Sequence, residues 1–308
     1  MKHVPVLLRE CLEGLAIRPD GIYVDGTLGR AGHSIEIAKR LTGGRLIAID
    51  RDEAAIHEAG ERLREYMDKV TLVHGNFSEI AEILDSLNIP EVDGMLFDLG
   101  VSSPQLDDAE RGFSYMHDCA LDMRMDKRDA LTAHKIVNEW AESDIRKILY
   151  EYGEERYSLS IARAIVRRRA ETPINTTFEL NDIIRSAIPA AARREKQHPA
   201  KRSYQAIRIA VNDELGAVKR VLEQAPDKLK SGGRICVISF HSLEDRQVKN
   251  AFASREKGCT CPKDFPVCIC GFMPTLKVIT RKPIAPREDE LDENPRARSA
   301  RLRMAQRV

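Results

Sequence analysis

The sequence lacks any apolar run long enough to cross a bilayer, and charged residues enter its first ten positions too early for a secretory signal. We therefore expect a cytoplasmic protein with no membrane partner. Its seven cysteines are an odd number and three are widely scattered, which argues against a disulfide framework and fits a reducing compartment. Internal repeats and low-complexity segments are also missing. With 308 residues, 43% of them hydrophobic, the chain can fill a full α/β domain and a smaller second core.

A net charge is nearly absent as well, because 49 Lys and Arg residues stand against 48 Asp and Glu. The distribution along the chain is uneven. From Glu155 to Arg208 there are twelve Lys or Arg and five Asp or Glu, so this span carries +7 and the remainder −6. The span is a candidate surface for a polyanion, and a solvated helical face is the alternative.

The first hundred residues alternate between short apolar strands and helical segments. The expected strands are Ile22 to Asp25, Arg45 to Asp50, Val70 to Val73 and Gly94 to Leu99. Unbroken apolar strands are typical of sheets covered on both faces, and intervening helices of this length favour parallel pairing. The pattern predicts an α/β fold with a doubly wound parallel sheet.

The alternation stops after Gly100. From Ser102 to roughly Tyr204 the patterns are helical, which predicts an inserted helical domain, and a long helix from Gln205 to about Gln224 should return the chain to the sheet. Later strands are expected at Arg234 to Phe240, Leu276 to Thr280 and Ser299 to Met304, the last two as an antiparallel edge pair. The expected division is residues 1–103 and 205–308 for the sheet domain and 104–204 for the insertion.

A dinucleotide-binding Gly-x-Gly-x-x-Gly loop is also missing. In its place Gly26, Gly29 and Gly32 follow a strand that ends at Asp25, and Ser34 is expected to open a helix over residues 35–41. Amides at such a helix start suit a carboxylate or phosphate, whereas Asp25 would repel a pyrophosphate and accept from an ammonium. A nucleotide-like ligand with a zwitterionic amino-acid moiety fits these residues, and an ordinary tight turn is the alternative.

Polar or aromatic residues end the other expected strands. In an open parallel sheet, ligands bind beyond the carboxyl ends of the strands, where Asp50, Asn76 and Asp98 should lie. The carboxylate of Asp50 can accept from both ribose hydroxyls. Phe77 can pack against an adenine ring, and Asn76 or a nearby amide can read the edge of that ring. Together with Asp25, these strand tips predict a nucleoside cofactor site.

Eight motifs in fixed order resemble those of the bacterial ribosomal RNA small-subunit methyltransferase H family, also called MraW. They are His3-x-Pro5-Val-Leu-Leu8, Asp25-Gly-Thr-Leu-Gly29-x-Ala-Gly32-His33-Ser34, Asp98-Leu-Gly-Val-Ser-Ser-Pro-Gln-Leu-Asp107, Arg111-Gly-Phe-Ser114, Leu121-Asp-Met-Arg-Met125, Ala206-Ile-Arg-Ile-Ala-Val-Asn212, Phe240-His-Ser-Leu-Glu-Asp-Arg246 and Asn294-Pro-Arg-Ala-Arg-Ser299. The match runs nearly end to end. Long motifs in order are far more specific than a glycine loop alone.

The resemblance implies a class I S-adenosylmethionine-dependent methyltransferase sheet, Rossmann-like, with an inserted helical RNA-binding domain. It also implies the reaction. A methyl group would pass from S-adenosyl-L-methionine to the exocyclic N4 amine of a cytidine in the decoding region of 16S rRNA. The substrate partner is then 16S rRNA or the small ribosomal subunit.

By position, the resemblance also assigns the site residues. Cofactor contacts fall on Ala31, Gly32, His33, Asp50, Phe77, Asp98 and Gln105. Asp98 is also the expected catalytic residue, because an acceptor for the N–H groups of the cytosine amine would restore its nucleophilicity. Residue 31 is Ala where many relatives have Gly, so its methyl group could crowd a backbone approach. His33 could cap the helix instead of contacting the cofactor.

Asp98 and the carbonyl groups of residues 100–104 stand where amino-directed methyltransferases have an acidic-Pro-Pro-aromatic motif. The variant here lacks the final aromatic residue. Candidates for stacking on the target base are Phe113, Tyr115 and Phe240. His241 and Ser242 follow the strand expected beside Asp98, within reach of the base in that layout. The alternative for Ser242 is a helix cap.

The basic span would supply contacts to RNA phosphates. Its cations are Arg163, Arg167, Arg168 and Arg169 on one helix, and Arg193, Arg194, Lys196, Lys201 and Arg202, with His198, in a loop. If about six phosphates are neutralised, affinity should fall on the order of a thousandfold between low and moderate salt.

Two Cys-x-Cys pairs, Cys259-Thr-Cys261 and Cys268-Ile-Cys270, are separated by six residues. This spacing suits a small zinc knuckle, and four reduced thiols in a surface loop are the alternative. The resemblance does not require this motif, and we expect no catalytic role for it.

Two other classes of function compete with this interpretation. The cofactor site could serve a methyltransferase that acts on a protein or a small molecule, for which a basic insertion would be unnecessary. The chain could also be a nucleic-acid-binding regulator that retains cofactor binding without turnover. Asp98 and its turn argue against the regulator.

Overall fold

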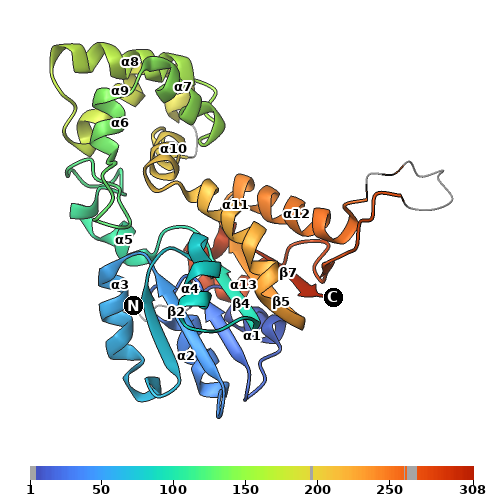
Figure 1. The fold of residues 1–308 in the computed structure, drawn as a ribbon. Coiled ribbons are helices and arrows are strands. Elements are labelled where there is room, and N and C mark those ends of the chain that lie inside the picture. The colour runs from blue at the N-terminus through green and yellow to red at the C-terminus, as the bar shows by residue number, and fades with distance from the viewer. Residues whose placement is uncertain (1–4, 195–196, 260, 262–268) are drawn as a thin grey trace. The chain divides into compact units, whose positions relative to one another are not determined.

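The computed structural model describes residues 5–194, 197–259, 261 and 269–308. These residues form two compact units (Figure 1). One unit contains the chain up to Gly100 and from Leu215 onward, and the other contains Val101–Glu214. The second unit therefore continues past residue 204, the expected end of the insertion, because helix α10 (Lys201–Asn212) contributes Tyr204, Ile207 and neighbouring side chains to its core.

A seven-stranded sheet forms the first unit, with the strand order β3-β2-β1-β4-β5-β7-β6. Its strands are β1 (Ile22–Asp25), β2 (Arg45–Asp50), β3 (Val70–His74), β4 (Val92–Asp98), β5 (Leu229–Ser239), β6 (Leu276–Val278) and β7 (Arg301–Arg307). Strands β1 to β5 pair in parallel, and β7 lies antiparallel between β5 and β6. This topology confirms the expected class I methyltransferase fold. The strand order reverses between β1 and β4, which is where ligands bind in such sheets.

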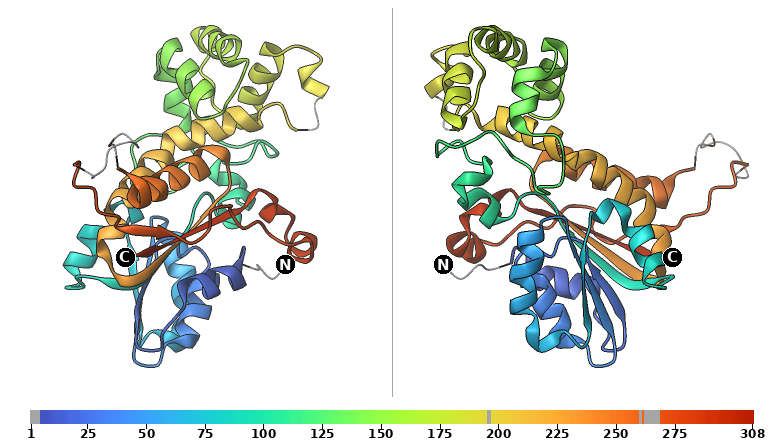
Figure 2. Two further views of the ribbon diagram at one scale, coloured as in Figure 1. Left: turned by 90° about the vertical axis from the view of Figure 1, so that its right-hand side faces the viewer. Right: turned by 60° about the vertical axis from the view of Figure 1, so that its left-hand side comes forward.

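Helices cover both faces of the sheet (Figure 2). One layer contains α1 (Leu8–Leu15), α2 (Gly32–Arg40) and α3 (Glu53–Arg62), and the other contains α4 (Ile80–Ser86), α11 (Glu214–Gln224) and α12 (Ser242–Lys257). Strand β2 shows the consequence for sequence. Its Leu46 and Ala48 pack into the first layer while Ile47 and Ile49 pack into the second, so every interior position is apolar.

Short elements complete this unit. They are the 3-10 helices η1 (Arg64–Tyr66), η2 (Phe77–Glu79), η5 (Ala225–Lys228) and η6 (Pro295–Ser299), and helix α13 (Glu288–Glu293). No helix in the described part of the chain is long and apolar enough to cross a membrane.

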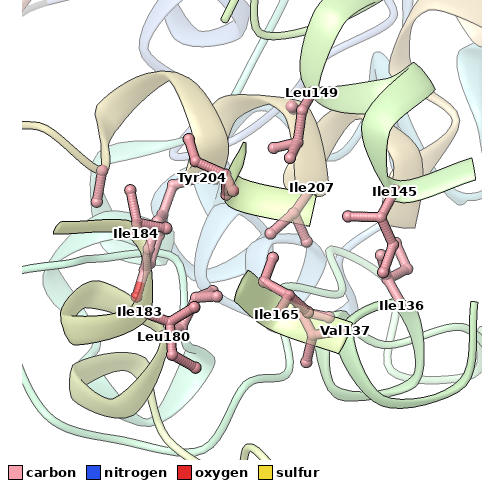
Figure 3. Close-up of a cluster of buried hydrophobic side chains, with 14 of the residues drawn as sticks. Ile136, Val137, Ile145, Leu149, Ile165, Leu180, Ile183, Ile184, Tyr204 and Ile207 are labelled. Carbon is pink, nitrogen blue, oxygen red and sulfur yellow. The ribbon is translucent and has the colours of Figure 1, made fainter. Parts of the chain in front are cut away.

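The second unit is helical, as expected for the insertion. It contains α5 (Ser103–Asp107), η3 (Ala109–Arg111), α6 (Ala133–Glu139), α7 (Glu142–Glu151), α8 (Ser158–Glu171), α9 (Thr177–Ala187), η4 (Ala192–Arg194) and α10. Its core is a cluster of aliphatic side chains around Ile165 and Ile207, closed on one side by Tyr204 (Figure 3). Thr176 and Glu179 form a capping box that begins α9.

The prediction of one long helix from Gln205 to about Gln224 is wrong. The helix breaks at Asp213, which has a left-handed backbone with φ of 47° and separates α10 from α11. Short polar residues tolerate this conformation better than most. Asn212 fixes the break, because its buried amide accepts from the N–H of Met125 at 2.8 Å and donates to the carbonyl of Met123 at 2.7 Å.

Candidate active site at the strand tips

Three carboxylates lie at the carboxyl ends of adjacent strands. Asp25 ends β1 and pairs with Ala48 of β2 on one side and Leu96 of β4 on the other. Asp50 and Asp98, which end β2 and β4, therefore project past Asp25 on either side. The parallel register thus gathers the carboxylates at one edge of the sheet, next to the glycine loop.

The glycine loop is held tightly by its neighbours. A Cβ atom added to Gly26 would lie 2.4 Å from the ring of Phe97, and one added to Gly32 would lie 2.4 Å from Pro5. Gly29 has a left-handed backbone with φ of 48°. These three positions require glycine because of two close approaches and one positive φ.

Ala31 has a left-handed backbone with φ of 58° and caps α2, which begins at Gly32. For a residue with a Cβ atom this conformation costs roughly 1–2 kcal/mol. The methyl group is fully buried in the core, which offsets part of that cost. The prediction that Ser34 opens the helix is wrong. Ser34 lies within the first turn, and its hydroxyl donates to Oδ2 of Asp25 at 2.6 Å.

Asp50 connects the loop to the end of β2. Its Oδ2 accepts from the N–H of Gly29 at 2.8 Å, and its Oδ1 accepts from the N–H of Asp52 at 2.9 Å. Burial raises the pKa of Asp50 to about 6 despite these two backbone hydrogen bonds. Each carboxylate oxygen has a second acceptor position, so the geometry is compatible with ribose hydroxyls.

Asp98 has a carboxyl group whose pKa is strongly raised. Its backbone N–H donates to Oγ1 of Thr27 at 2.6 Å, which ties β4 to the glycine loop. Its Oδ1 is buried and has no hydrogen-bond partner among the residues that the structure describes. Burial, together with the negative charges of Asp25 and Glu244, raises the pKa of Asp98 to about 8.

His33 lies on the first turn of α2 and is buried. Its Nε2 is 3.0 Å from the carbonyl oxygen of Val6. Since a carbonyl only accepts, Nε2 carries the proton. Its Nδ1 faces Oδ2 of Asp98 at 3.9 Å. His33 therefore does not cap the helix, and it joins the segment before α1 to the catalytic candidate.

Phe77 begins η2 and packs edge-to-face on Phe97, with ring centroids 5.8 Å apart. Its Cβ also lies beside Gly26, so the aromatic ring is placed next to the loop. Asn76 has a local role, because its Oδ1 accepts from the N–H of Ser78 at 3.0 Å and caps the same 3-10 turn. Of the two expected readers of the adenine edge, a backbone amide is the one that this arrangement favours.

Gln105 belongs to α5 in the second unit. Its side chain is buried, and its Oε1 accepts from the N–H of Ser102 at 3.0 Å. This hydrogen bond stabilises the turn that follows β4. Its contact with the cofactor stays a prediction.

A model of the MraW methylase family matches residues 1–308 of this chain. The chain belongs to this family. It is 58% identical over 314 residues to "Ribosomal RNA small subunit methyltransferase H" of Paenibacillus sp. (strain JDR-2), covering 100% of this chain and 99% of that protein. It is also 58% identical over 307 residues to the protein of the same name from Brevibacillus brevis, covering 99% and 98%. It is 54% identical over 308 residues to the protein of the same name from Lachnospira eligens, covering 100% of this chain and 98% of that protein.

Membership of the MraW methylase family makes S-adenosylmethionine the cofactor, and the strand tips fit it. Its ammonium and sulfonium groups are cationic, and the tips are acidic. The buried Oδ1 of Asp98 would gain a donor or a positive charge. Gly29 offers backbone that is open to a ligand, since no atom lies closer than 3.9 Å to an added Cβ.

Reasoning from sequence missed Thr27, Ser34 and Glu244. Thr27 and Ser34 orient Asp98 and Asp25 by hydrogen bonds, and the only signal for them in the sequence is a hydroxyl group within the glycine loop. Glu244 is 1% exposed, and its Oε2 accepts from the N–H of Phe240 at 2.8 Å. In the sequence, Glu244 is an interior position of the helix start Ser242-Leu-Glu-Asp245, and nothing there indicates its electrostatic effect on the site.

The start of α12 and the expected base-stacking residues also differ from expectation. His241, and not Ser242, is the N-cap of α12, and its Nε2 lies 3.1 Å from Oε1 of Glu244. Phe113 is buried in the core of the insertion, and Tyr115 stacks on His198 with centroids 4.4 Å apart. Among the three stacking candidates, Phe240 is the one in the sheet unit, next to Gly100.

Proposed function

We propose that this MraW methylase transfers a methyl group from S-adenosyl-L-methionine to the N4 amine of a cytidine in the decoding region of 16S rRNA. The observation that carries the proposal is the buried Oδ1 of Asp98, which has no hydrogen-bond partner in the described part of the chain. A group that accepts from an amine needs such an available oxygen. The names of the relatives, ribosomal RNA small subunit methyltransferases, support rRNA as the substrate. Such a substrate places the enzyme in the cytoplasm.

The cofactor would be held by the residues at the strand tips. Asp50 would accept from the ribose hydroxyls, and Phe77 would pack against the adenine ring. The loop from Ala31 to His33 would bind the amino-acid moiety, with its carboxylate near the amides at the start of α2. Asp98 and Gln105 would complete the site.

When bound, S-adenosylmethionine supplies an electrophilic methyl group. The lone pair of the cytosine amine is delocalised into the ring, so the protein must make that amine more nucleophilic. An ionised Asp98 would accept a hydrogen bond from an N–H of the amine and would stabilise the positive charge that develops on its nitrogen. With its pKa near 8, the carboxyl is mostly protonated at neutral pH until a cationic group lies beside it. A cationic ligand and the catalytic ionisation of Asp98 would therefore favour each other.

RNA would bind to basic residues of the insertion. Arg156, Arg163 and Arg167 line a hollow of about 470 Å³ along α8. Arg163 pairs with Glu142 at 3.4 Å, but both side chains are exposed, so this pair contributes little and can give way to a phosphate. Arg167 forms no ion pair within the residues described here. These guanidinium groups are the ones that we assign to phosphate contacts.

Besides Arg168, which donates to the carbonyl of Thr172 at 3.1 Å, two other cations of the expected RNA surface donate to backbone carbonyls. Arg169 donates to the carbonyls of Val137 at 2.9 Å and Trp140 at 2.6 Å, so it closes the end of α6. Arg193 donates to the carbonyl of Ile188 at 3.1 Å beyond the end of α9. We assign both to the stability of the insertion. Lys196 lies outside the described residues.

The proposal is tested by labelled methyl transfer from S-adenosylmethionine to unmodified small ribosomal subunits, naked 16S rRNA and total protein. The products are digested to nucleosides, and we expect label that elutes as N4-methylcytidine. Label found only in protein, or cofactor binding without any transfer, would contradict the proposal and favour one of the competing functions.

A variant pair links the reaction to its residue. Asp98→Ala should abolish transfer while RNA affinity stays within a few fold, because the insertion is unchanged. Asp68→Ala removes an exposed carboxylate from the same unit and should leave transfer unchanged. Undiminished activity of Asp98→Ala would remove this residue from the mechanism.

A further inference from the structure

Three cysteines after α12 form a cluster outside the methyl-transfer site. The Sγ atoms of Cys259, Cys261 and Cys270 all lie within 4.8 Å of one another. We propose that these three thiols bind a zinc ion. Cys268, which the sequence pattern groups with them, lies outside the described residues, and the proposal rests on the other three.

The spacing of the sulfur atoms suits a shared metal better than a disulfide. Sγ of Cys259 and Sγ of Cys270 are 3.6 Å apart. A disulfide bond measures about 2.05 Å, so these atoms are not bonded. In a tetrahedral zinc site with Zn–S distances of about 2.3 Å, two sulfur ligands are about 3.8 Å apart. The separation in the structure is close to that value.

The backbone supports the charge that a metal ligand must carry. The N–H of Ile269 points to Sγ of Cys261 at a distance of 3.3 Å. A donor aimed at sulfur favours the thiolate over the thiol, and thiolate is the form that binds zinc.

The segment that holds the thiols follows the end of α12 (Figure 1), and the chain after it is tied back to the same helix. The N–H of Thr275 donates to the carbonyl of Arg255 at 3.0 Å, and the N–H of Val278 donates to Oε1 of Glu256 at 2.9 Å. The ring of Phe272 lies so close to Gly258 that an added Cβ would be 2.6 Å from it. The base of the loop is therefore closed before a metal binds, which lowers the entropic cost of assembling the ligands.

Zinc is the metal that this ligand set favours. Soft thiolates select zinc and other thiophilic ions over magnesium or calcium, which require oxygen ligands. Cys259 and Cys270 are exposed, so the ion can enter from solvent. Its role is structural, because it links Cys259 and Cys261 to Cys270. Methyl transfer proceeds at other residues, so the two properties can be measured separately.

The experiment is metal analysis of the full chain, purified under reducing conditions and then supplied with zinc and desalted. We expect about one zinc ion per chain. Cys259→Ser, Cys261→Ser and Cys270→Ser should each lose most of the metal. Cys119→Ser is the matched control, since its thiol lies in the insertion beside Thr177 and should leave the zinc content unchanged.

Cobalt substitution gives a second readout that does not depend on activity. Tetrahedral thiolate coordination of Co²⁺ produces intense visible absorption together with sulfur-to-metal charge transfer, and both should disappear in the three serine variants. Binding of S-adenosylmethionine by each variant shows that the sheet unit is still folded. Absence of zinc and cobalt from the reduced wild-type chain, or retention of the metal in all three variants, would overturn the proposal.

Discussion

Replacing Asp98 by Asn should change the pH dependence of stability in the ligand-free protein. The folded state raises the pKa of Asp98 from the ordinary value of 3.8 to about 8, because the carboxyl is buried near Asp25 and Glu244. The folded protein therefore prefers the protonated form. The stabilisation that follows is complete below the unfolded pKa and is lost as the pH rises through about 8. Wild-type protein should be less stable at pH values near 8.5 than near 5.5.

The magnitude follows from the shift in pKa. Each pH unit between the unfolded and folded pKa values corresponds to about 1.4 kcal/mol. From about pH 5.5 to about pH 8.5, Asp98 should therefore lower the free energy of unfolding by at most about 3 kcal/mol. The figure is an upper value, since a quarter of the side chain is exposed and solvent screens its charge. An Asn amide does not titrate, so this part of the pH dependence should disappear in the variant.

Urea unfolding at the two pH values measures the difference. The only tryptophan, Trp140, lies in the inserted unit, so its fluorescence reports that unit, while circular dichroism reports both. Asp98→Asn should change the pH dependence of unfolding measured by circular dichroism. It should leave the pH dependence measured by Trp140 fluorescence unaltered. Asp50, whose pKa is about 6, titrates in both proteins and drops out of the comparison.

The control is Asp68→Asn, which makes the same chemical change at an exposed position of the sheet unit. It should follow the wild-type pH dependence. If Asp98→Asn and wild type lose equal stability between the two pH values, the raised pKa of Asp98 is refuted. The catalytic role would then need another basis.

Three further results are expected. Asp50→Ala should weaken cofactor binding roughly 10- to 100-fold in calorimetry and leave RNA binding unchanged, since it removes a charged acceptor; equal loss for both ligands would contradict this. Arg163→Ala combined with Arg167→Ala should weaken RNA binding and reduce the slope of log K against log salt by about 2, and an unchanged slope would exclude phosphate contacts. Asn212→Ala should lower the free energy of unfolding of the insertion, followed by Trp140 fluorescence, by about 2–3 kcal/mol, because the buried N–H of Met125 loses its acceptor. A change below about 0.5 kcal/mol would count against the role of this amide.

The sheet could be predicted from sequence because its strands are buried on both faces. Strand β2 is apolar from Leu46 to Ile49 and then ends in Asp50, so both its extent and its acidic tip are visible in the sequence. The same logic located Asp25 and Asp98. The helices between the strands predict that the strands pair in parallel. Parallel pairing in turn places the carboxyl ends of the strands at one edge of the sheet, so the sequence also predicts that these residues lie close together.

Hydrogen bonds across the loop could not be predicted in this way. Ser34 has the residue type and position of a helix cap, yet its hydroxyl donates to Asp25 because the helix begins two residues earlier. The end of α10 shows a similar limit. The periodic pattern continues through Asp213, and only the tertiary contacts of Asn212 with the segment around Met125 explain why the helix stops. Local patterns describe propensity, whereas these outcomes depend on partners distant in sequence.

The electrostatics of the site show the same limit and link stability to function. Asp98, Asp25 and Glu244 come from two strands and a helix, and their mutual repulsion exists only when the sheet is assembled. The repulsion destabilises the ionised, ligand-free protein, and a cationic ligand relieves it. Under the proposed function, affinity for a sulfonium cofactor and the instability of the ligand-free site therefore have one physical origin. A substitution that neutralises Asp98 should stabilise the fold at alkaline pH and abolish methyl transfer for the same reason.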